Sequence, residues 1–166
     1  MVKILEATVA EIPIIQEIAE IAWKATYSHI LAREQLRFML DAIYSHQELA
    51  KVMTEGSQKF LILEDKEGHQ GFASFGARKE EPGVFKLHKI YIMPQNQGKG
   101  YGSLLIDEIK RRLTIQGINV LDLNVNRNNE AREFYKKLGF KIIREEDVPI
   151  GQYWMNDYVM RLTIVD

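Results

Sequence analysis

The sequence predicts an α+β domain in which a mixed, mostly antiparallel sheet is flanked by helices. Two observations lead to this prediction. Residues 59–63, 70–77 and 84–93 are strand-like segments that follow one another through short polar turns, which is the pattern of antiparallel hairpins. An amphipathic helix over residues 101–113 then leads to an apolar strand over residues 118–125. This second pattern is typical of a βαβ unit, whose two strands are parallel.

The N-terminal part of the chain predicts one strand and three helices. A strand over residues 2–7 is followed by Thr8 and Glu11, which have the spacing of a capping box. Apolar residues then recur at three- and four-residue steps, so we expect a helix that ends near Thr26. Two further helical segments are expected: residues 33–44, and residues 46–54 with Ser45 as the N-cap.

The C-terminal part predicts one more helix and two strands. Asn128 can cap an amphipathic helix whose apolar stripe ends near Leu138. A strand over residues 140–143 follows, and we expect an acidic turn at residues 145–147 to interrupt it before a last strand over residues 152–165.

Composition limits the functional classes. A length of 166 residues that are 46% hydrophobic predicts a single domain, residues 1–166. The chain has no cysteine, which excludes disulfides, thiolate metal sites and a cysteine nucleophile, and its 4 histidines show no ligand spacing. A net charge of -1 gives no general attraction to nucleic acid or to anionic membranes. No apolar segment approaches the ~18 residues of a membrane span, and Glu6 is unlike a signal peptide, so we expect a cytoplasmic protein.

A glycine-rich loop lies between the strand that ends at residue 93 and the helix that follows. Gly98, Gly100 and Gly102 remove side chains where the helix begins, which leaves backbone amides free to approach an anion such as a pyrophosphate. The loop is not a Walker loop, because Met93 stands at the first glycine position and Gly100 at the serine or threonine position. Its G-x-G-x-G spacing also differs from the G-x-G-x-x-G of dinucleotide-binding folds.

The loop resembles the Gln/Arg-x-x-Gly-x-Gly/Ala signature of the GCN5-related N-acetyltransferases (GNAT family). Gln97, Gly100 and Gly102 match it, after an apolar strand that ends at Pro94. The second half of the chain is also similar to that family, in three segments: Leu123-Asn124-Val125, Asn128-x-x-Ala131 and Phe134-Tyr135-Lys136-Lys137-Leu138-Gly139-Phe140. The order of strands and helices agrees from end to end, and residues 44–49 resemble the PaiA-type polyamine acetyltransferases.

This resemblance implies acetyl-CoA as co-substrate, bound between two splayed parallel strands without a metal ion. The pantetheine arm would pair with the backbone of Ile90, Tyr91 and Ile92. The pyrophosphate would meet the amides of the loop residues: Gln97, Gly98, Lys99, Gly100, Tyr101, Gly102 and Ser103. The Lys99 side chain either touches phosphate or points to solvent. Asn128 either binds the pantetheine arm, caps the following helix, or does both.

Transfer from a thioester to an amine requires a neutral amine, a polarised carbonyl and a proton for the leaving thiolate. The family places its general acid at Tyr135, although a tyrosine on an apolar stripe is also a common core residue. Positions where some members carry a basic Glu hold His88 and Asn124; Asn124 cannot accept a proton, so the base is His88 or water. Trp23, Tyr27 and Asn124 are candidates for the acceptor side.

The resulting hypothesis is an acetyl-CoA-dependent N-acetyltransferase that acts by direct attack of a primary amine. A small amine or a polyamine is the favoured acceptor, and a protein N-terminus or lysine is the alternative. A non-catalytic acyl-CoA-binding module is the competing class. We expect no nucleic-acid or membrane partner, and the resemblance implies a homodimer.

Overall fold

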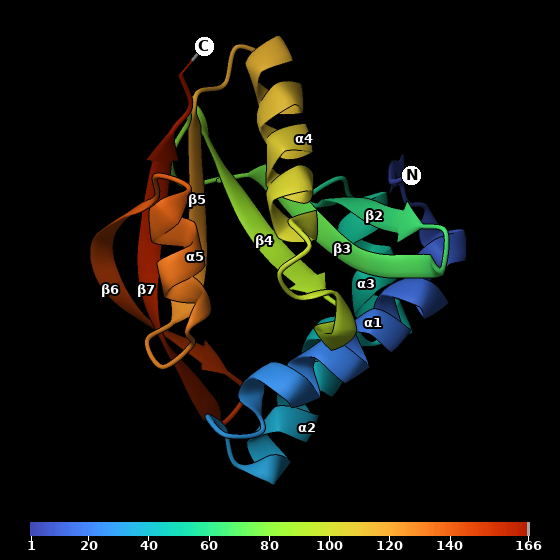
Figure 1. Cartoon of the computed structure of the whole chain (residues 1–166). Helices are drawn as coiled ribbons and strands as arrows, with labels where there is room; N and C mark the ends of the chain where they lie inside the picture. The colour runs from blue at the N-terminus through green and yellow to red at the C-terminus, as the bar shows by residue number, and fades with distance from the viewer. Residues whose placement is uncertain (166) are drawn as a thin grey trace.

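The computed structural model describes residues 1–165, which form one seven-stranded sheet with helices on both faces (Figure 1). The strand order is β1-β2-β3-β4-β5-β7-β6, and β4 with β5 is the one parallel pair, so the predicted α+β fold is confirmed. The strands are β1 (Lys3–Glu6), β2 (Lys59–Asp65), β3 (Gly68–Ala77), β4 (Val84–Ile92), β5 (Val120–Asn126), β6 (Lys141–Ile150) and β7 (Tyr153–Thr163). The helices are α1 (Ile12–Tyr27), α2 (Arg33–Tyr44), α3 (His46–Thr54), α4 (Tyr101–Ile115) and α5 (Ala131–Lys137), with short 3₁₀ turns η1 (Val9–Glu11) and η2 (Pro94–Asn96). Within residues 1–165, no helix combines the length and the apolar character that a membrane crossing requires.

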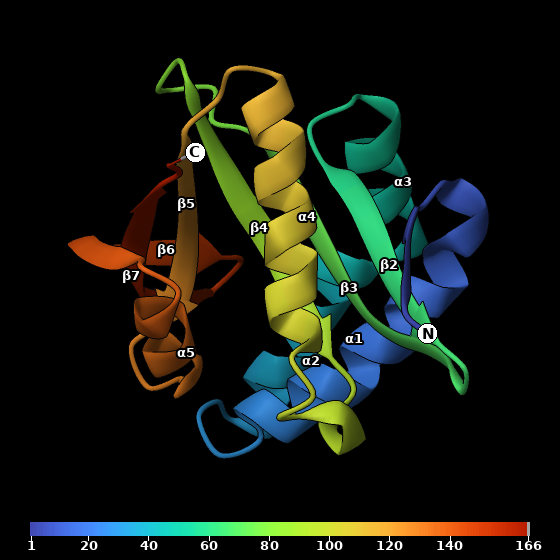
Figure 2. The ribbon, with the colours of Figure 1, turned by 45° about the horizontal axis from the view of Figure 1, so that its top comes forward.

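Two apolar clusters, one on each face, hold the helices to the sheet. Helix α4 buries Leu105 and Ile109 against Leu123 of β5 on the face that α5 also covers (Figure 2). On the other face, Ile15 of α1 packs in a cluster with Phe72 of β3 and with apolar residues of α2 and α3. The apolar periodicity of each helix therefore predicts the side that it buries.

Both predicted N-caps in the first half of the chain are confirmed. The Thr8 hydroxyl accepts a hydrogen bond from the amide of Ala10, and the Glu11 carboxylate accepts one from the Thr8 amide at 2.7 Å. The Ser45 hydroxyl accepts from the amide of Glu48 at 3.1 Å and starts α3. These caps are local in sequence, which is why the pattern of residues is enough to find them.

Strands β4 and β5 are paired over only part of their length. Their register runs from Val84 opposite Val120 to Leu87 opposite Leu123. Beyond that point β4 remains paired with β3 and β5 with β7, so their facing edges separate (Figure 1). His88 is the first residue of β4 past this pairing and forms a β-bulge, because Leu87 and Lys89 face consecutive residues of β3. A bulge bends its strand, which accounts for the divergence beginning here.

The predicted acidic turn at residues 145–147 is wrong. Strand β6 runs through Glu145, Glu146 and Asp147, and the chain reverses at Gly151, which has a φ of 60°. β6 is an edge strand with most side chains exposed, and charged residues are tolerated there because they face water and discourage edge-to-edge pairing. The acidic run therefore marks an edge strand and not a turn. The turn after β2 is also shorter than expected, since β2 extends to Asp65.

The prediction that Asn128 caps α5 is also wrong. The side chain of Asn129 accepts the hydrogen bond from the Ala131 amide at 2.9 Å. The backbone of Asn128 instead donates to the Asn126 carboxamide, also at 2.9 Å. Adjacent asparagines offer the same cap chemistry, so only the path of the loop decides between them. The Asn128 side chain is left exposed, without a capping role.

Candidate active site

A cavity of about 1000 Å³ occupies the gap between the diverging ends of β4 and β5. Its wall is completed by the end of α1, the glycine-rich loop and α5. It contains these residues that the sequence singled out: Tyr27, His88, Ile90, Tyr91, Ile92, Gln97, Gly98, Gly100, Tyr101, Gly102, Asn124, Asn128 and Tyr135. The fold therefore brings together the glycine-rich loop, the unpaired edge of β4 and the polar residues Asn124, Asn128 and Tyr135.

The glycine-rich loop presents an open helix N-terminus to this cavity. Gly100, the N-cap of α4, has a φ of 81°, and Gly98 has a φ of 85°, a region that side-chain-bearing residues rarely adopt. Among the described residues, no side chain caps the first turn of α4. The free amides and the positive end of the helix dipole therefore give this end of the cavity a chemistry that favours an anion.

Gly102 differs from the other two glycines, because at this position the absence of a side chain matters for space. A Cβ at this position would lie 3.2 Å from Cζ of Phe134 on α5. The first turn of α4 and the Phe134 ring of α5 thus approach closely, and an alanine at this position would require that ring to shift by a few tenths of an ångström. Ser103, one residue further along α4, lies outside the cavity wall.

Three polar residues that sequence reasoning missed hold the loop in place, and two of them, Gln70 and Asn96, are buried. The Asp65 carboxylate at the end of β2 accepts hydrogen bonds from the Tyr101 hydroxyl at 2.7 Å and from the Gln70 amide at 3.2 Å. The Gln70 carbonyl oxygen accepts in turn from the Asn96 side chain, whose own oxygen accepts from the Lys99 ammonium at 2.8 Å. Lys99 is thus directed toward η2 and away from the cavity wall. Asp65, Gln70 and Asn96 come from separate segments, so spacing in the sequence could not reveal them.

Tyr135 lies on α5 at the inner side of the cavity. Its side chain is buried, and its ring packs edge to face against Phe134 and Phe140 at centroid distances of 5.4 and 5.8 Å. Burial, and to a smaller extent the nearby Tyr27, raise the pKa of the Tyr135 hydroxyl above its usual value. The hydroxyl therefore keeps its proton throughout the neutral pH range, as a proton donor must.

Tyr27 and Tyr91 approach the same region from α1 and β4. Burial raises the pKa of both hydroxyls, and the Tyr27 side chain lies close to those of Tyr91 and Asn129. Trp23 lies beneath them in the core, with its ring 4.6 Å from that of Tyr27 and its indole N–H donating to the Tyr44 hydroxyl at 3.2 Å. Trp23 thus packs against the Tyr27 ring within the core and does not line the cavity.

His88 lies on the cavity wall at the bulge of β4, where its side chain reaches solvent although many protein atoms surround the ring. Desolvation by the surrounding protein is the larger cause that lowers its pKa well below the usual value, and the cations of Lys86, Lys89 and Arg78 add to it. The imidazole is consequently neutral at physiological pH. It is also a weak base there, because the environment opposes the charged form that proton transfer would create.

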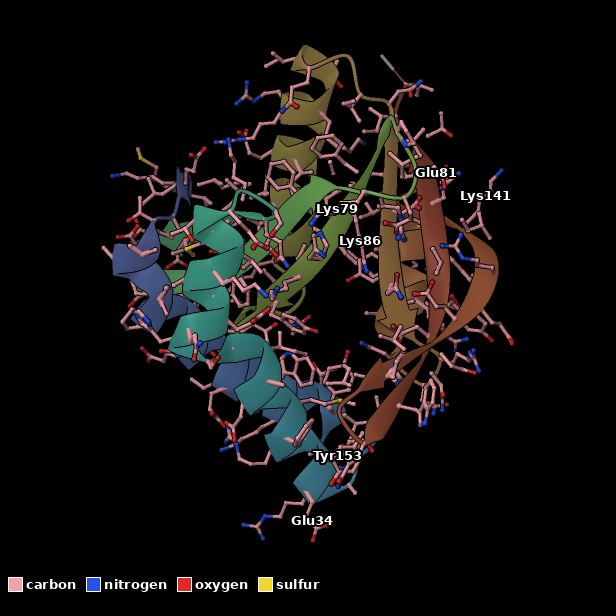
Figure 3. All side chains as sticks on the ribbon, turned by 180° about the vertical axis from the view of Figure 1, so that it is seen from behind. Glu34, Lys79, Glu81, Lys86, Lys141 and Tyr153 are labelled. Carbon is pink, nitrogen blue, oxygen red and sulfur yellow. The ribbon has the colours of Figure 1, made fainter. Side chains whose placement is uncertain are left out.

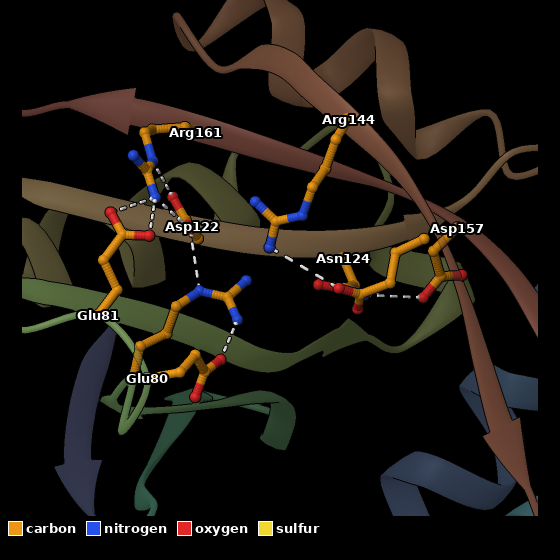
Figure 4. Close-up of polar contacts among 9 residues, drawn as sticks. Glu80, Glu81, Asp122, Asn124, Arg144, Asp157 and Arg161 are labelled. Atoms are coloured by element: carbon orange, nitrogen blue, oxygen red, sulfur yellow. Dashed lines mark hydrogen bonds and ion pairs between the residues drawn. The ribbon is translucent and has the colours of Figure 1, made fainter.

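The polar face of β5 carries two clusters of side chains (Figure 4). Asp122 is fully buried and accepts from Arg78 of the β3–β4 connection at 2.9 Å and from Arg161 of β7 at 2.7 Å. This cluster ties the paired ends of β4, β5 and β7 together. The second cluster surrounds Asn124, whose amide nitrogen donates to Glu146 at 2.9 Å and to Asp157 at 3.2 Å.

These clusters lie on the side of the sheet away from α4. Figure 3 shows this side, where Lys86 projects from β4, Glu81 lies in the turn between β3 and β4, and no described helix covers β5, β7 and β6. The cavity therefore has two kinds of wall, the glycine-rich loop with α5 on one side and this open polar face on the other. Residues 1–165 contain no group of three His, Cys, Asp or Glu side chains placed to hold a metal ion.

The family model for the acetyltransferase (GNAT) domain matches residues 27–162. The chain belongs to the GNAT family. An uncharacterized N-acetyltransferase of Mycobacterium tuberculosis is 29% identical to this GNAT protein over 131 residues, which are 78% of this chain and 83% of the relative. A spermidine N(1)-acetyltransferase of Thermoplasma acidophilum is 24% identical over 143 residues, or 85% and 89% of the two chains.

Solved structures of GNAT proteins share the whole fold. The PaiA N-acetyltransferase from Thermoplasma acidophilum, solved in complex with coenzyme A, superposes with a TM-score of 0.83 at 24% identity, covering 98% of this chain and 99% of that one. The ribosomal-protein-S18-alanine N-acetyltransferase from Escherichia coli gives a TM-score of 0.73 at 21% identity, covering 100% and 96%. The predicted family, the fold and the assignment as an acetyl-CoA-dependent N-acetyltransferase are thereby confirmed.

Proposed function

We propose that this GNAT protein transfers the acetyl group of acetyl-CoA to a primary amine of a small molecule, with polyamines as the favoured acceptors. The observation that carries the proposal is a single cavity with an uncapped helix N-terminus at one end and the buried, protonated Tyr135 hydroxyl on its inner wall. The similarity to a spermidine N(1)-acetyltransferase over most of both chains supports the choice of acceptor.

The co-substrate is assigned to the side of the cavity that faces α4 and α5. Residues 90–92 of β4 lie beyond the pairing with β5, so their backbone groups on that edge are available to the amides of a pantetheine arm. The amides of residues 97–103 would bind the pyrophosphate. Asn128, which has no capping role, is free to donate to the pantetheine arm. Lys99 and Ser103 contribute backbone groups and not side chains in this arrangement.

The reaction needs no covalent enzyme intermediate. The neutral amine attacks the thioester carbonyl, a C–N bond forms and the C–S bond breaks as Tyr135 gives its proton to the leaving thiolate. Tyr27 and Asn124 are placed on the acceptor side. The lowered pKa of His88 favours water over its imidazole as the acceptor of the proton that the amine nitrogen loses once the C–N bond has formed. The carboxylates of Glu146, which also pairs with Arg144 at 3.7 Å, and of Asp157 lie beside Asn124 and can attract a cationic group of the acceptor.

Measurement of thiol release from acetyl-CoA across an amine panel tests the acceptor. The panel contains spermidine, spermine, a small monoamine, a peptide with a free N-terminal alanine and a peptide with an internal lysine. We expect release with the polyamines to exceed release with either peptide. Release with the peptides alone would instead favour the protein acetyltransferase alternative, and thermal stabilisation by CoA without any release would indicate an acyl-CoA-binding module.

Replacement of Gly100 by alanine tests the anion site. The substitution strains the left-handed backbone at the start of α4 by about 1 kcal/mol and displaces the amides, so we expect the affinity for CoA to fall about tenfold. Gly83 is a matched control, because it has a φ of 85°, open space around it and a position in the β3–β4 turn. Calorimetric titration with CoA should show a loss in Gly100→Ala alone; equal affinities in the two variants would contradict the assignment.

A further inference from the structure

Asn124, Glu146 and Asp157 form a cluster, here called the amide clamp, on the open polar face of the sheet. They come from β5, β6 and β7, and Glu146 lies directly opposite Asp157 in the strand register. Figure 4 shows Asn124 close to Asp157. Of the three residues, Asn124 lies on the cavity wall.

The two carboxylates determine the orientation of the Asn124 amide. An ionised carboxylate only accepts hydrogen bonds, so the NH₂ group of Asn124 has to face Glu146 and Asp157, at 2.9 and 3.2 Å. Both hydrogens of that group are then used. The carbonyl oxygen Oδ1 is buried and has no hydrogen-bond partner within residues 1–165. A buried acceptor without a donor is costly, and an arriving N–H group would remove that cost.

Asp157 is the more deeply buried of the two carboxylates. It is only 6% exposed, and its second oxygen, Oδ1, also has no partner in the part of the chain that the structure describes. Burial is the main cause that raises its pKa to about 6, with Glu146 of β6 acting in the same direction. Hydrogen bonding by Asn124 and the cations of Lys86 on β4 and Arg127 after β5 oppose this shift, and Tyr27 of α1 also lies nearby.

We propose that Asn124 Oδ1 accepts the N–H of the acceptor amine, and that Asp157 and Glu146 are positioning residues that hold the Asn124 amide in this orientation. The inference rests on the proposed function and adds to it the residue that aligns the acceptor. Once Asp157 is protonated, its O–H becomes a donor that competes for Asn124 Oδ1 and favours the flipped amide. Acceptor binding should therefore weaken as the pH falls below about 6.

Two substitutions of Asp157 distinguish a positioning role from a role as the proton acceptor. Asp157→Asn keeps an oxygen that can accept from Asn124 but cannot ionise, so we expect kcat/KM for spermidine at pH 8 within about threefold of wild type, without the acid limb near pH 6. Asp157→Ala removes one of the two acceptors that orient the Asn124 amide and leaves Glu146 as the other, and we expect KM for spermidine to rise about tenfold while the affinity for CoA is unchanged. Asp107→Asn, at an exposed position on α4, is the control and should behave as wild type.

The measurements are steady-state thiol release at pH 5 to 9, calorimetric titration with CoA and thermal unfolding of each variant. Loss of turnover in Asp157→Asn at all pH values would overturn the positioning role, because it would make Asp157 the proton acceptor. An unchanged KM for spermidine in a folded Asp157→Ala variant would also overturn it. In both cases thiol release by the wild type leaves the proposed function intact, whereas no release by the wild type with any amine would overturn the proposed function and the inference together.

Discussion

Replacement of Tyr135 by phenylalanine is expected to lower kcat about a thousandfold, within the range typical of removing a general acid. The ring remains, so its packing against Phe134 and Phe140 and the shape of the cavity are preserved. What is lost is the hydroxyl, whose raised pKa keeps it protonated at neutral pH and able to supply a proton to a strongly basic thiolate. The affinity for acetyl-CoA should therefore stay close to that of the wild type.

Single-turnover and steady-state thiol release at saturating substrates measure this effect. Tyr158→Phe is the matched control, since Tyr158 lies on β7, where Arg127 and Arg132 pack on its ring, and outside the cavity wall. An unchanged kcat in Tyr135→Phe would assign Tyr135 to the core alone. A loss of CoA affinity equal to the loss of kcat would instead point to a binding role.

Replacement of Gly76 by alanine is expected to reduce the free energy of unfolding by about 3 kcal/mol, near the upper end of the usual cost of overpacking. Gly76 lies in β3, where the segment between α3 and β2 crosses it so closely that a Cβ would be 1.9 Å from the Ser57 carbonyl oxygen. Both groups are backbone, so neither can move aside without disturbing the sheet. The reduction should appear in urea denaturation as a lower midpoint with an unchanged slope.

Gly71 provides the comparison on the same strand. A Cβ there would lie 2.5 Å from the terminal carbon of the Ile92 side chain, which can rotate away, and 3.0 Å from the Tyr91 carbonyl oxygen. We therefore expect Gly71→Ala to cost about 1 kcal/mol, clearly less than Gly76→Ala. Similar losses in both variants would contradict the assignment of the effect to the rigid contact with Ser57.

The sequence by itself determined the features that depend on neighbouring residues. The N-caps at Thr8 and Ser45, the apolar faces of the helices and the glycine-rich loop all follow from local spacing, because each involves contacts within one or two turns of chain. The order of hairpins and crossover also indicates which strands are antiparallel. Together these features predict the fold class, and the resemblance of the loop and of three segments within residues 123–140 to the GNAT signature predicts the family.

Only the tertiary structure decided the features that join distant segments. The hydrogen bonds from Asp65 to Tyr101 and from Asn124 to Asp157 link residues 36 and 33 positions apart, and no pattern in the sequence marks either pair. The strand register likewise placed the bulge at His88 and carried β6 through the acidic run that resembled a turn. Local chemistry thus specified the elements and the anion-binding loop. The packing of strands against one another determined which side chains meet at the acceptor side and how burial shifts their pKa values.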